Sequence, residues 1–263
     1  MREIICPSLS AYLIKESYIK INTDRIIDFY SNQDKPTFER MIKEDEFIEL
    51  RPIAKGSTCM VYLIYHIEDE KLYAIKKQSE VNEKFEKLRK REIENYRKIK
   101  HPFLPKFIGL TQEKQDLVLE YINGQTLLDT DISNYSETDI FSIINQIISV
   151  FEYLHENHFI YRDLKPNNII IDSNKIAILI DFDRMIKENE IINDNNNENN
   201  SNENERSNEN DCTNDFAATE YVAPETNSGK MSNKCDIYSI GKNINYIMNR
   251  KYSNYFIKYP SIS

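Results

Sequence analysis

Hydrophobic and polar positions begin to alternate at Phe47, with the period of two that is typical of strands. Five segments rich in β-branched and aromatic residues predict strands: 47–54, 59–67, 71–78, 104–111 and 115–122. The acidic residues 68–70, between the second and third of these segments, predict a hairpin turn. The first half of the chain is therefore expected to form a mostly antiparallel sheet.

A helix is predicted between the third and fourth strands, over residues 80–100. Its apolar residues recur at helical spacing and form one narrow stripe: Val81, Phe85, Leu88, Tyr96 and Ile99. Glu92 falls in the middle of that stripe. A carboxylate on a buried helix face is costly unless it is paired. The periodicity alone therefore predicts a cationic partner for Glu92.

Helices dominate the second half of the chain. Asn123-Gly124 predicts a loop, and Ser136 is the expected N-cap of a long helix that ends near Glu156. The remaining elements are short strands and a last helix, expected at 159–163, 168–172, 176–182 and from Asp236 onward. Strands first and helices second predict an α+β chain with two unequal lobes. Residues 1–46 carry no motif and are expected to form either a short helical extension packed on the domain or a loose tail.

The composition bounds the class of protein. Of the 263 residues 40% are hydrophobic, which is enough to bury a substantial core. The formal net charge of -9 argues against a nucleic-acid binder, which would carry a basic patch or stripe. Residues 187–214 alone hold eight acidic and two basic side chains together with 12 Asn. Such a segment cannot build a core and is expected to be a disordered acidic insertion.

The cysteines and the apolar segments bear on the compartment. Four cysteines lie far apart without a CxxC pair, which indicates free thiols in a reducing compartment and neither a disulfide framework nor a zinc site. The N-terminus lacks the continuous apolar core of a signal peptide. The most apolar window, 140–154, is too short to span a bilayer. The protein is therefore expected to be cytoplasmic, with no membrane span.

The most informative segment is residues 161–168, Tyr-Arg-Asp-Leu-Lys-Pro-Asn-Asn, followed by Asp181-Phe182-Asp183. It resembles the catalytic loop and the metal-binding motif of the eukaryotic protein kinases, and Asp-Leu-Lys-Pro resembles their Ser/Thr-directed branch. A polar turn between strands would explain these residues singly, but it would not explain several fixed spacings together. The resemblance covers residues 47–250.

This resemblance implies a bilobal protein kinase fold over residues 47–263. The small antiparallel N-lobe with one helix would occupy 47–121, and the mainly helical C-lobe would occupy 122–263. Residues 1–46 would be an N-terminal extension of unknown role. The implied reaction is transfer of the γ-phosphate of ATP to serine or threonine hydroxyls of a protein substrate, with Mg²⁺ as cofactor.

The resemblance also assigns the catalytic roles. Asp163 would orient the substrate hydroxyl and accept its proton, and Lys165 would contact the γ-phosphate. Asn168 and Asp181 would hold two magnesium ions, for which oxygen ligands are suitable. An arginine before the catalytic aspartate, here Arg162, often pairs with an activation-loop phosphate in the family.

A lysine on a predicted strand and a glutamate on the predicted helix are the remaining charged residues of the expected active site. Lys76, in Tyr-Ala-Ile-Lys, matches the lysine that holds the α- and β-phosphates. Alignment on His101-Pro102 places its family partner at Glu92, the residue that the periodicity had already marked. Two independent arguments therefore predict one ion pair, whereas a strand lysine such as Lys77 is ordinarily only solvated.

The nucleotide site is expected around the first three strands. The family's glycine loop falls on residues 54–61, where Gly56 is the only one of three glycines that remains and Ala54 takes the place of another. Small residues there would still let backbone N–H groups reach the phosphates, with less freedom. The resemblance assigns the adenine sandwich, the gate of the rear pocket and the linker between the lobes to Val61, Ala74, Ile170, Leu119 and Glu120 to Ile122. Each of these residues also suits an ordinary core position.

Further positions match the family without a direct chemical role. Its internal hydrophobic spine falls on four large side chains that plain packing would also explain: Tyr96, Phe107, Tyr161 and Phe182. Residues 220–225 resemble the end of the activation segment. Asp236 matches an aspartate that hydrogen-bonds the catalytic-loop backbone, and it could also serve as the N-cap of the last helix.

Some positions depart from the family pattern. Asp183 replaces a glycine, which would cost about 1–2 kcal/mol if a left-handed backbone were needed there. Ala218 replaces a threonine that braces the catalytic aspartate, and Thr219 follows one place later. Thr213 lies near the expected activating phosphorylation site, with Ser207 and Ser201 further upstream and with Asp215 or the acidic insertion as alternative sources of negative charge.

Two other functions stay open on the sequence alone. A kinase-like scaffold or nucleotide-binding regulatory module without catalysis fits the eroded glycine loop, although it would not need all the charged catalytic positions. Transfer to a small molecule is disfavoured by the segment 218–225 and by Asp-Leu-Lys-Pro. The chain ends soon after the helix expected from Asp236, so the C-lobe is expected to be truncated, and a partner could cover the surface left apolar.

Overall fold

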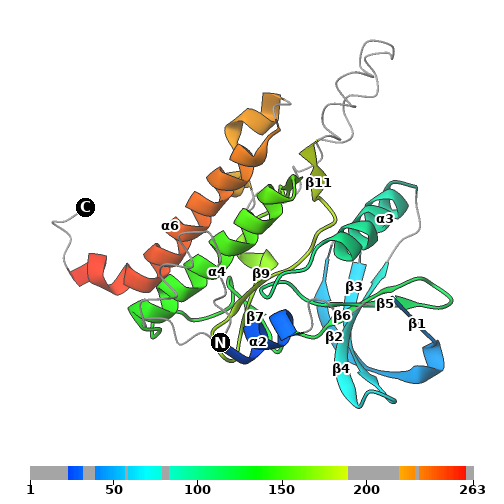
Figure 1. Cartoon of the computed structure of the whole chain (residues 1–263). Helices are drawn as coiled ribbons and strands as arrows, with labels where there is room; N and C mark the ends of the chain where they lie inside the picture. Colours follow the sequence, from blue (N-terminus) through cyan, green and yellow to red (C-terminus); the bar gives the residue numbers. More distant parts are fainter. Residues whose placement is uncertain are drawn as a thin grey trace, which may run out of the picture.

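The computed structural model describes residues 23–31, 39–56, 59–78, 83–188, 219–228 and 231–258. The described strands and helices form two lobes (Figure 1). The first half of the chain builds a lobe around one large sheet, and the second half builds a lobe around two long helices. This arrangement confirms the α+β, bilobal fold predicted from the sequence.

The small lobe contains a six-stranded sheet in the order β1-β5-β6-β4-β3-β2. Its strands are β1 (Arg40–Ile42), β2 (Phe47–Lys55), β3 (Cys59–His66), β4 (Lys71–Gln78), β5 (Phe107–Thr111) and β6 (Leu117–Glu120). Strands β3 and β4 pair antiparallel through the expected turn at 67–70. Strand β5 begins at Phe107 and not at 104, because Pro105 has no N–H for a strand ladder.

The sheet buries one face in a small core of its own. Alternation along β3 and β4 places Ile64 opposite Tyr73 and brings Ile75 to the same side. The members of this core are Ile42, Ile64, Tyr73, Ile75 and Val118. The outer ends of the sheet leave apolar side chains exposed, including Ile48 at 52% and Leu72 at 43%.

Strand β1 extends the small lobe beyond its expected start at residue 47. It pairs in parallel with β5, with Arg40 opposite Gly109. A Cβ on Gly109 would lie 2.0 Å from the Arg40 carbonyl oxygen, so the approach of the two strands requires glycine there. Residues 40–46, which include the short 3₁₀ turn Glu44–Glu46, therefore belong structurally to the sheet. The remainder of the expected extension includes helix α2 (Thr23–Ser31).

Helix α3 (Glu83–Lys98) is the one helix expected in the small lobe. Its stripe of apolar residues packs into the main core, where Ile93, Tyr96 and Ile99 are buried. The predicted start at residue 80, with Val81, lies outside the described residues. Glu92 lies on the buried face with 4% of its surface exposed, as the periodicity predicted.

The large lobe is organised around helices α4 (Glu137–Glu156) and α6 (Asn233–Lys258), which contact each other. Two small sheets, β10-β9-β7 and β11-β8, lie beside them. Their strands are β7 (Gly124–Thr126), β8 (Phe159–Ile160), β9 (Ile169–Asp172), β10 (Ala177–Leu179) and β11 (Ile186–Lys187). Short 3₁₀ turns occupy Pro166–Asn168, Thr219–Tyr221 and Pro224–Ser228.

Helix α4 begins at the predicted N-cap. The Ser136 side chain accepts a hydrogen bond from the Asp139 amide at 3.1 Å, and the Asp139 carboxylate accepts one from the Ser136 amide at 2.8 Å. This reciprocal pair is a capping box, which satisfies two backbone donors at the start of the helix. The helix then buries its apolar face, including Ile143, Phe151 and Leu154, in the main core.

Several boundaries in the large lobe also differ from the prediction, among them that of the strand expected at 176–182, which is Ala177–Leu179. Gly124 opens strand β7 instead of lying in a loop, and a Cβ there would sit 2.3 Å from the Ile171 carbonyl oxygen. The strand expected at 159–163 ends at Ile160, because Arg162 has a φ of 72°, outside the β region. Helix α6 begins at Asn233, so Asp236 lies inside its first turn and is not its N-cap.

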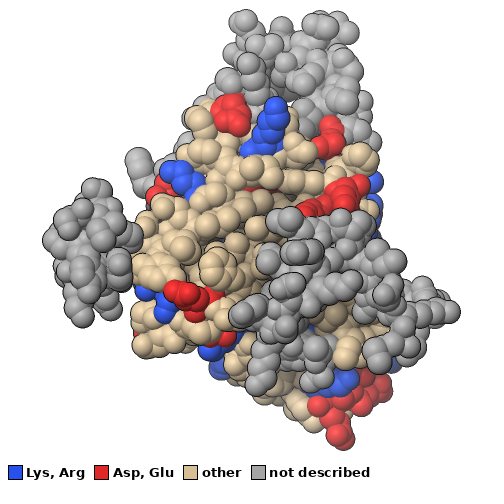
Figure 2. Space-filling model, turned by 60° about the vertical axis from the view of Figure 1, so that its left-hand side comes forward, with Lys and Arg blue, Asp and Glu red and all other residues tan. Residues whose placement is uncertain are grey.

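None of the helices in the described part of the chain is long and apolar enough to cross a membrane. On the face shown in Figure 2, the Lys and Arg side chains are scattered among acidic ones over a largely uncharged surface. The main core runs between the lobes, from Ile93 on α3 to Ile240 and Ile247 on α6. The lobes are therefore joined by packed side chains as well as by the chain itself.

Candidate active site

The loop between β8 and β9 brings together three of the predicted site residues. The Asp163 carboxylate lies 3.1 Å from Lys165 Nζ. The Asn168 side-chain amide donates to the Asp163 carbonyl oxygen at 2.8 Å and to its carboxylate at 3.0 Å. Asp163 is partly exposed, whereas Asn168 is 5% exposed. The buried amide therefore orients an accessible carboxylate.

Asp236 holds this loop from the large-lobe core. Its carboxylate, fully buried, accepts hydrogen bonds from the backbone amides of Tyr161 and Arg162, both at 2.9 Å. His155 Nε2 on α4 lies 2.9 Å from the same carboxylate. Arg162 keeps its left-handed backbone under this constraint, and sparsely populated conformations of this kind persist where the surroundings determine them. The backbone role expected for Asp236 is present.

Lys76 on β4 bridges two carboxylates that lie far apart in the chain. Its Nζ is 2.7 Å from Glu92 Oε1 on α3 and 2.9 Å from Asp181 Oδ1 after β10. The side chains of Lys76 and Glu92 are 15% and 5% exposed, and that of Asp181 is 35% exposed. The cationic partner predicted for Glu92 is therefore Lys76, and the same ammonium reaches the predicted metal ligand.

Burial and this shared ammonium set the protonation of the carboxyls. Burial raises the pKa of Glu92 to about 7, against the opposing effect of Lys76. Burial also acts to raise the pKa of Asp181, but the Lys76 ammonium outweighs it and holds that pKa below its ordinary value. Of these two carboxyl groups, Asp181 is therefore the one that stays ionised more readily as pH falls.

Asp183, in the position of the family's glycine, does not adopt the left-handed backbone that would have made it costly. Asp181 is in that region, with a φ of 67°, while Asp183 is not among the described residues with positive φ. Burial, and next the neighbouring Asp181 carboxylate, raises the pKa of Asp183 to about 6. The backbone strain that a left-handed conformation would have caused at position 183 is therefore absent. The Asp183 carboxyl instead contributes to the raised pKa of Glu92.

Aromatic rings connect α3, the segment after β10 and the catalytic loop. The Tyr96 and Phe182 rings meet edge to face with centroids 5.0 Å apart, and Phe182 meets Tyr161 at 5.5 Å. Phe151 on α4 continues the series against Tyr161 at 5.7 Å. Phe107 is partly buried against the same core. Tyr96, Phe182 and Tyr161, three of the four spine positions, thus form one series of edge-to-face contacts. Phe151 extends this series and was not suggested by the sequence.

The predicted adenine-site residues come from both lobes. On the sheet, Val61 pairs with Ala54 on one side and with Lys76 on the other. Ala74 pairs with Leu119 on β6. Ile170 lies on β9 in the large lobe, and like Leu119 it is partly buried against the main core.

The linker that joins these residues is short. It runs from Glu120, the last residue of β6, to Gly124, the first residue of β7, and Ile122 within it is buried.

Gly56 closes the turn where the glycine loop is expected. Its amide donates to the Cys59 carbonyl oxygen at 2.9 Å, and a Cβ at Gly56 would lie 3.1 Å from Cys59 Sγ. Residues 57 and 58 lie outside the described part of the chain. The same holds for Ala218, Thr213 and most of the acidic insertion, and for the side chain of Thr219.

The residues present suit magnesium held jointly with phosphates. Both hydrogen bonds of the Asn168 side chain come from its nitrogen, which leaves the side-chain oxygen Oδ1 for a cation. Asn168 and Asp181 are brought close in the fold because the backbone amide of Ile180 donates to the backbone carbonyl oxygen of Asn168. No cluster of three or more His, Cys, Asp or Glu occurs in the described residues. Mg²⁺ commonly takes only one or two carboxylates and completes its shell with phosphates and water.

Asn95 is a site residue that the sequence analysis missed. Its buried amide donates to the carbonyl oxygens of Phe182 at 2.8 Å and Met185 at 2.9 Å. It thereby ties α3 to the segment that carries Asp181. Asn95 follows Glu92 by three residues and so lies near the same face of α3, which was the available signal.

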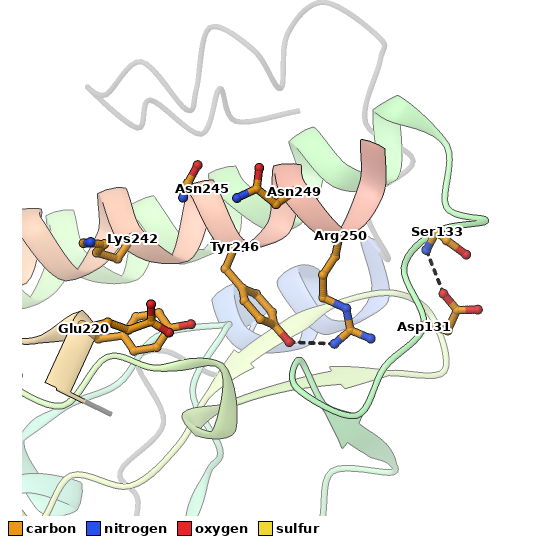
Figure 3. A pocket seen from close by; sticks show the side chains of 9 residues that line it. Asp131, Ser133, Glu220, Lys242, Asn245, Tyr246, Asn249 and Arg250 are labelled. Atoms are coloured by element: carbon orange, nitrogen blue, oxygen red, sulfur yellow. Dashed lines mark hydrogen bonds between the residues drawn. The ribbon is translucent and has the colours of Figure 1, made fainter. Parts of the chain in front are cut away.

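A hollow of about 450 Å³ lies on the large lobe beside α6 (Figure 3). Its lining includes Asp131, Glu220, Tyr221, Tyr246 and Arg250, and the Arg250 guanidinium donates to the Tyr246 hydroxyl at 2.7 Å. Tyr221 also lines a much smaller pocket with Asp163 and Lys165. Tyr221 therefore borders both the hollow and the loop that carries Asp163.

Comparisons with known proteins agree with this geometry. Residues 47–256 match the protein kinase domain family. The serine/threonine-protein kinase Sgk1 of Danio rerio is 37% identical over 167 residues, which are 59% of this chain and 37% of that protein. Myosin light chain kinase A of Dictyostelium discoideum is 33% identical over 129 residues, 47% of this chain and 44% of that protein. The Caenorhabditis elegans sgk-1 kinase is 33% identical over 159 residues, 56% of this chain and 34% of that protein.

The chain thus spans less than half the length of these relatives. The family match nevertheless includes every predicted catalytic position, from Lys76 on β4 to Asp181 after β10. The chain therefore belongs to the protein kinase family.

Proposed function

We propose that this chain is an active protein serine/threonine kinase, which transfers the γ-phosphate of ATP to protein hydroxyls. The observation that carries the proposal is the Lys76 bridge. One ammonium contacts both Glu92 and Asp181, so the residues that we propose bind phosphate and metal lie in contact. Preorganised charge of this kind is the main way in which proteins accelerate phosphoryl transfer.

Each residue has a defined task in this proposal. Asp163, oriented by Asn168, accepts the proton of the substrate hydroxyl while that oxygen attacks the γ-phosphorus. The bond from the γ-phosphorus to the oxygen it shares with the β-phosphate breaks, and ADP leaves. Lys165, 3.1 Å from Asp163, contacts the γ-phosphate and limits the repulsion between that carboxylate and the phosphate oxygens.

The remaining charged residues bind the rest of the nucleotide. Lys76 binds the α- and β-phosphates and is held in place by Glu92. Asn168 and Asp181 would hold Mg²⁺, which when bound neutralises charge on the β- and γ-phosphate oxygens. The adenine would lie between Val61 and Ala74 on one side and Ile170 on the other, with Leu119 behind it and the backbone of Glu120 to Ile122 beside it.

The peptide nature of the substrate rests on separate observations. The sequence Asp-Leu-Lys-Pro at 163–166 and the names of the Danio rerio and Caenorhabditis elegans relatives both favour Ser/Thr hydroxyls. The hollow next to Tyr221 offers a surface along which a polypeptide could lie while one of its residues reaches Asp163. The four cysteines lie far apart in the sequence without a CxxC pair, which favours a reducing compartment such as the cytoplasm.

The test is transfer of labelled γ-phosphate from Mg-ATP to the chain itself and to a generic basic protein, with Asp163→Asn as the matched variant. Phosphoserine or phosphothreonine that disappears in the variant supports an active kinase. Nucleotide binding by a folded sample without any transfer would favour the alternative, a kinase-like module that regulates or scaffolds a partner.

A further inference from the structure

The side chain of Arg25, on helix α2, joins two separate segments of the fold. Its Nη1 lies 2.7 Å from Glu120 Oε1, and its Nη2 lies 3.0 Å from Glu120 Oε2. The Nη2 also donates to the Leu104 carbonyl oxygen at 2.8 Å, and the Nε donates to the Pro102 carbonyl oxygen. One guanidinium therefore holds both oxygens of a carboxylate and two backbone carbonyls.

The two segments lie at points that bear on the nucleotide site. Pro102 and Leu104 belong to the loop that connects α3 to β5, and both are buried. Glu120 is the last residue of β6 and the first residue of the linker between the lobes. Its carboxylate also accepts a hydrogen bond from the Lys106 amide at 3.0 Å. Arg25 thus connects the loop that follows the helix carrying Glu92 to the start of the linker.

The geometry of this contact favours a specific role over an incidental surface pair. The side chains of Arg25 and Glu120 are 17% and 24% exposed. The planar fork of arginine matches a carboxylate with two parallel hydrogen bonds, and such charge-assisted pairs are the strong ones. The next residue, Ile26, packs against the main core and docks the same helix.

A second ion pair on α2 provides an internal comparison. Asp28 pairs with Lys106 Nζ, but these side chains are 51% and 52% exposed. Exposed pairs of this kind contribute little to stability because water screens them. The helix therefore makes an enclosed, directional contact at Arg25 and an exposed ion pair at Asp28, both with the segment around β5 and β6.

We propose that Arg25 is a positioning residue for the nucleotide site, a role that rests on the kinase function proposed above. The guanidinium does not touch the nucleotide. It holds the Glu120 side chain and so sets the backbone of Glu120 to Ile122, where the adenine would bind. Residues 23–31 are then a working part of the kinase domain, and displacement of α2 weakens nucleotide binding.

The experiment compares Arg25→Gln and Arg25→Lys with Asp28→Asn in the full chain. Dissociation constants for Mg-ADP, the KM for ATP and kcat are measured, together with amide hydrogen exchange of the 117–122 segment without nucleotide. Coupling by residues outside a binding site predicts a roughly three- to thirtyfold weaker nucleotide affinity for Arg25→Gln. The KM for ATP rises in parallel, kcat changes less, and exchange at 117–122 becomes faster. Arg25→Lys keeps the charge and falls between, and Asp28→Asn matches the unaltered chain.

The outcomes separate this inference from the function on which it rests. Unchanged nucleotide affinity and unchanged exchange in Arg25→Gln overturn the positioning role while leaving the kinase proposal intact. An equal loss in Asp28→Asn overturns it too, because docking of α2 in general would then be the cause. If the unaltered chain neither binds nucleotide nor transfers phosphate, both proposals fail. Should Arg25→Gln not fold, Arg25→Lys and Glu120→Gln provide the same comparison.

Discussion

The fully buried carboxylate of Asp236 accepts a hydrogen bond from the backbone amide of Tyr161 at 2.9 Å. Helix α6 and the catalytic loop are joined at this point, since the neighbouring Arg162 amide bonds the other carboxylate oxygen. Two backbone donors and one imidazole thus share a single buried anion. Charge-assisted bonds of this kind are stronger than neutral ones, and the loop depends on them for its conformation.

Replacement of that anion should loosen the catalytic loop. Asp236→Asn removes the charge and one acceptor, so we expect a loss of about 2–4 kcal/mol in the free energy of unfolding. Urea unfolding followed by circular dichroism measures the loss. Glu156→Gln makes the same chemical change at an exposed position at the end of α4 and should alter stability by under about 0.5 kcal/mol. Equal effects in the two variants would contradict the anchoring role of Asp236.

The Lys76 bridge predicts a variant with a distinctive pH dependence. Lys76→Met removes the cation that opposes burial at Glu92, so the pKa of Glu92 should rise above its present value of about 7. A buried carboxyl with a raised pKa binds its proton more tightly in the folded state than in the unfolded state. Stability should therefore fall as pH increases from the unfolded pKa toward the raised folded pKa.

Thermal unfolding of Lys76→Met between pH 5 and pH 8.5 tests this sign. The double variant Lys76→Met/Glu92→Gln is the control, since its amide does not titrate, and it should show a flatter profile. A single variant that becomes more stable with rising pH would rule out the assignment. Phosphate transfer should drop by roughly 10²–10³-fold in kcat, as for other lost electrostatic groups in an active site.

Local sequence signals accounted for the elements whose causes lie within one segment. The capping box of Ser136 and Asp139 needs only four residues, and the burial of Glu92 follows from the stripe of α3. The assembly of Asp163, Lys165 and Asn168 was expected from the resemblance of residues 161–168 to the catalytic loop of the protein kinases. Their chemical roles stay predictions until transfer is measured.

Long-range contacts account for what could not be foreseen. Arg25 reaches Glu120 across 95 positions of sequence, and β1 joins the sheet only because β5 offers a glycine where the two approach. A short polar side chain such as Asn95 gives no periodic signal of its own, so its bonds to Phe182 and Met185 appear only in the folded chain. Tertiary partners of this kind override local propensity.

Asn95 leads to a prediction about the coupling of α3 to the segment after β10. Asn95→Ala removes the side-chain donor from two buried carbonyl oxygens and leaves that of Phe182 with the longer bond from the Met185 amide at 3.3 Å, which should cost about 2–3 kcal/mol of unfolding free energy. Asn157→Ala removes a comparable bond, from Asn157 to the Tyr153 carbonyl oxygen, at an exposed site. We expect that control to cost under about 1 kcal/mol. Similar losses measured in urea for both variants would show that burial of the Asn95 bonds is unimportant.

His101 should make the folded state sensitive to acid. Its ring stacks on Tyr153 with centroids 5.3 Å apart, and its Nδ1 accepts a hydrogen bond from the Phe103 amide. Burial lowers the pKa of His101 to about 4, so the folded chain keeps the imidazole neutral while the unfolded chain protonates it near the ordinary value of 6.5.

The unfolded state therefore binds more protons between about pH 4 and 6.5, and stability must fall as pH decreases through that window, by up to about 3 kcal/mol. His101→Asn keeps a side-chain acceptor for the Phe103 amide but cannot titrate, so its loss of stability between pH 7 and pH 4.5 should be smaller than that of the unaltered chain. Urea unfolding at both pH values measures the two losses, and the comparison within each protein cancels the cost of the substitution itself. Parallel losses in the two proteins would mean that other groups, such as the carboxyls of the active site, carry the acid sensitivity.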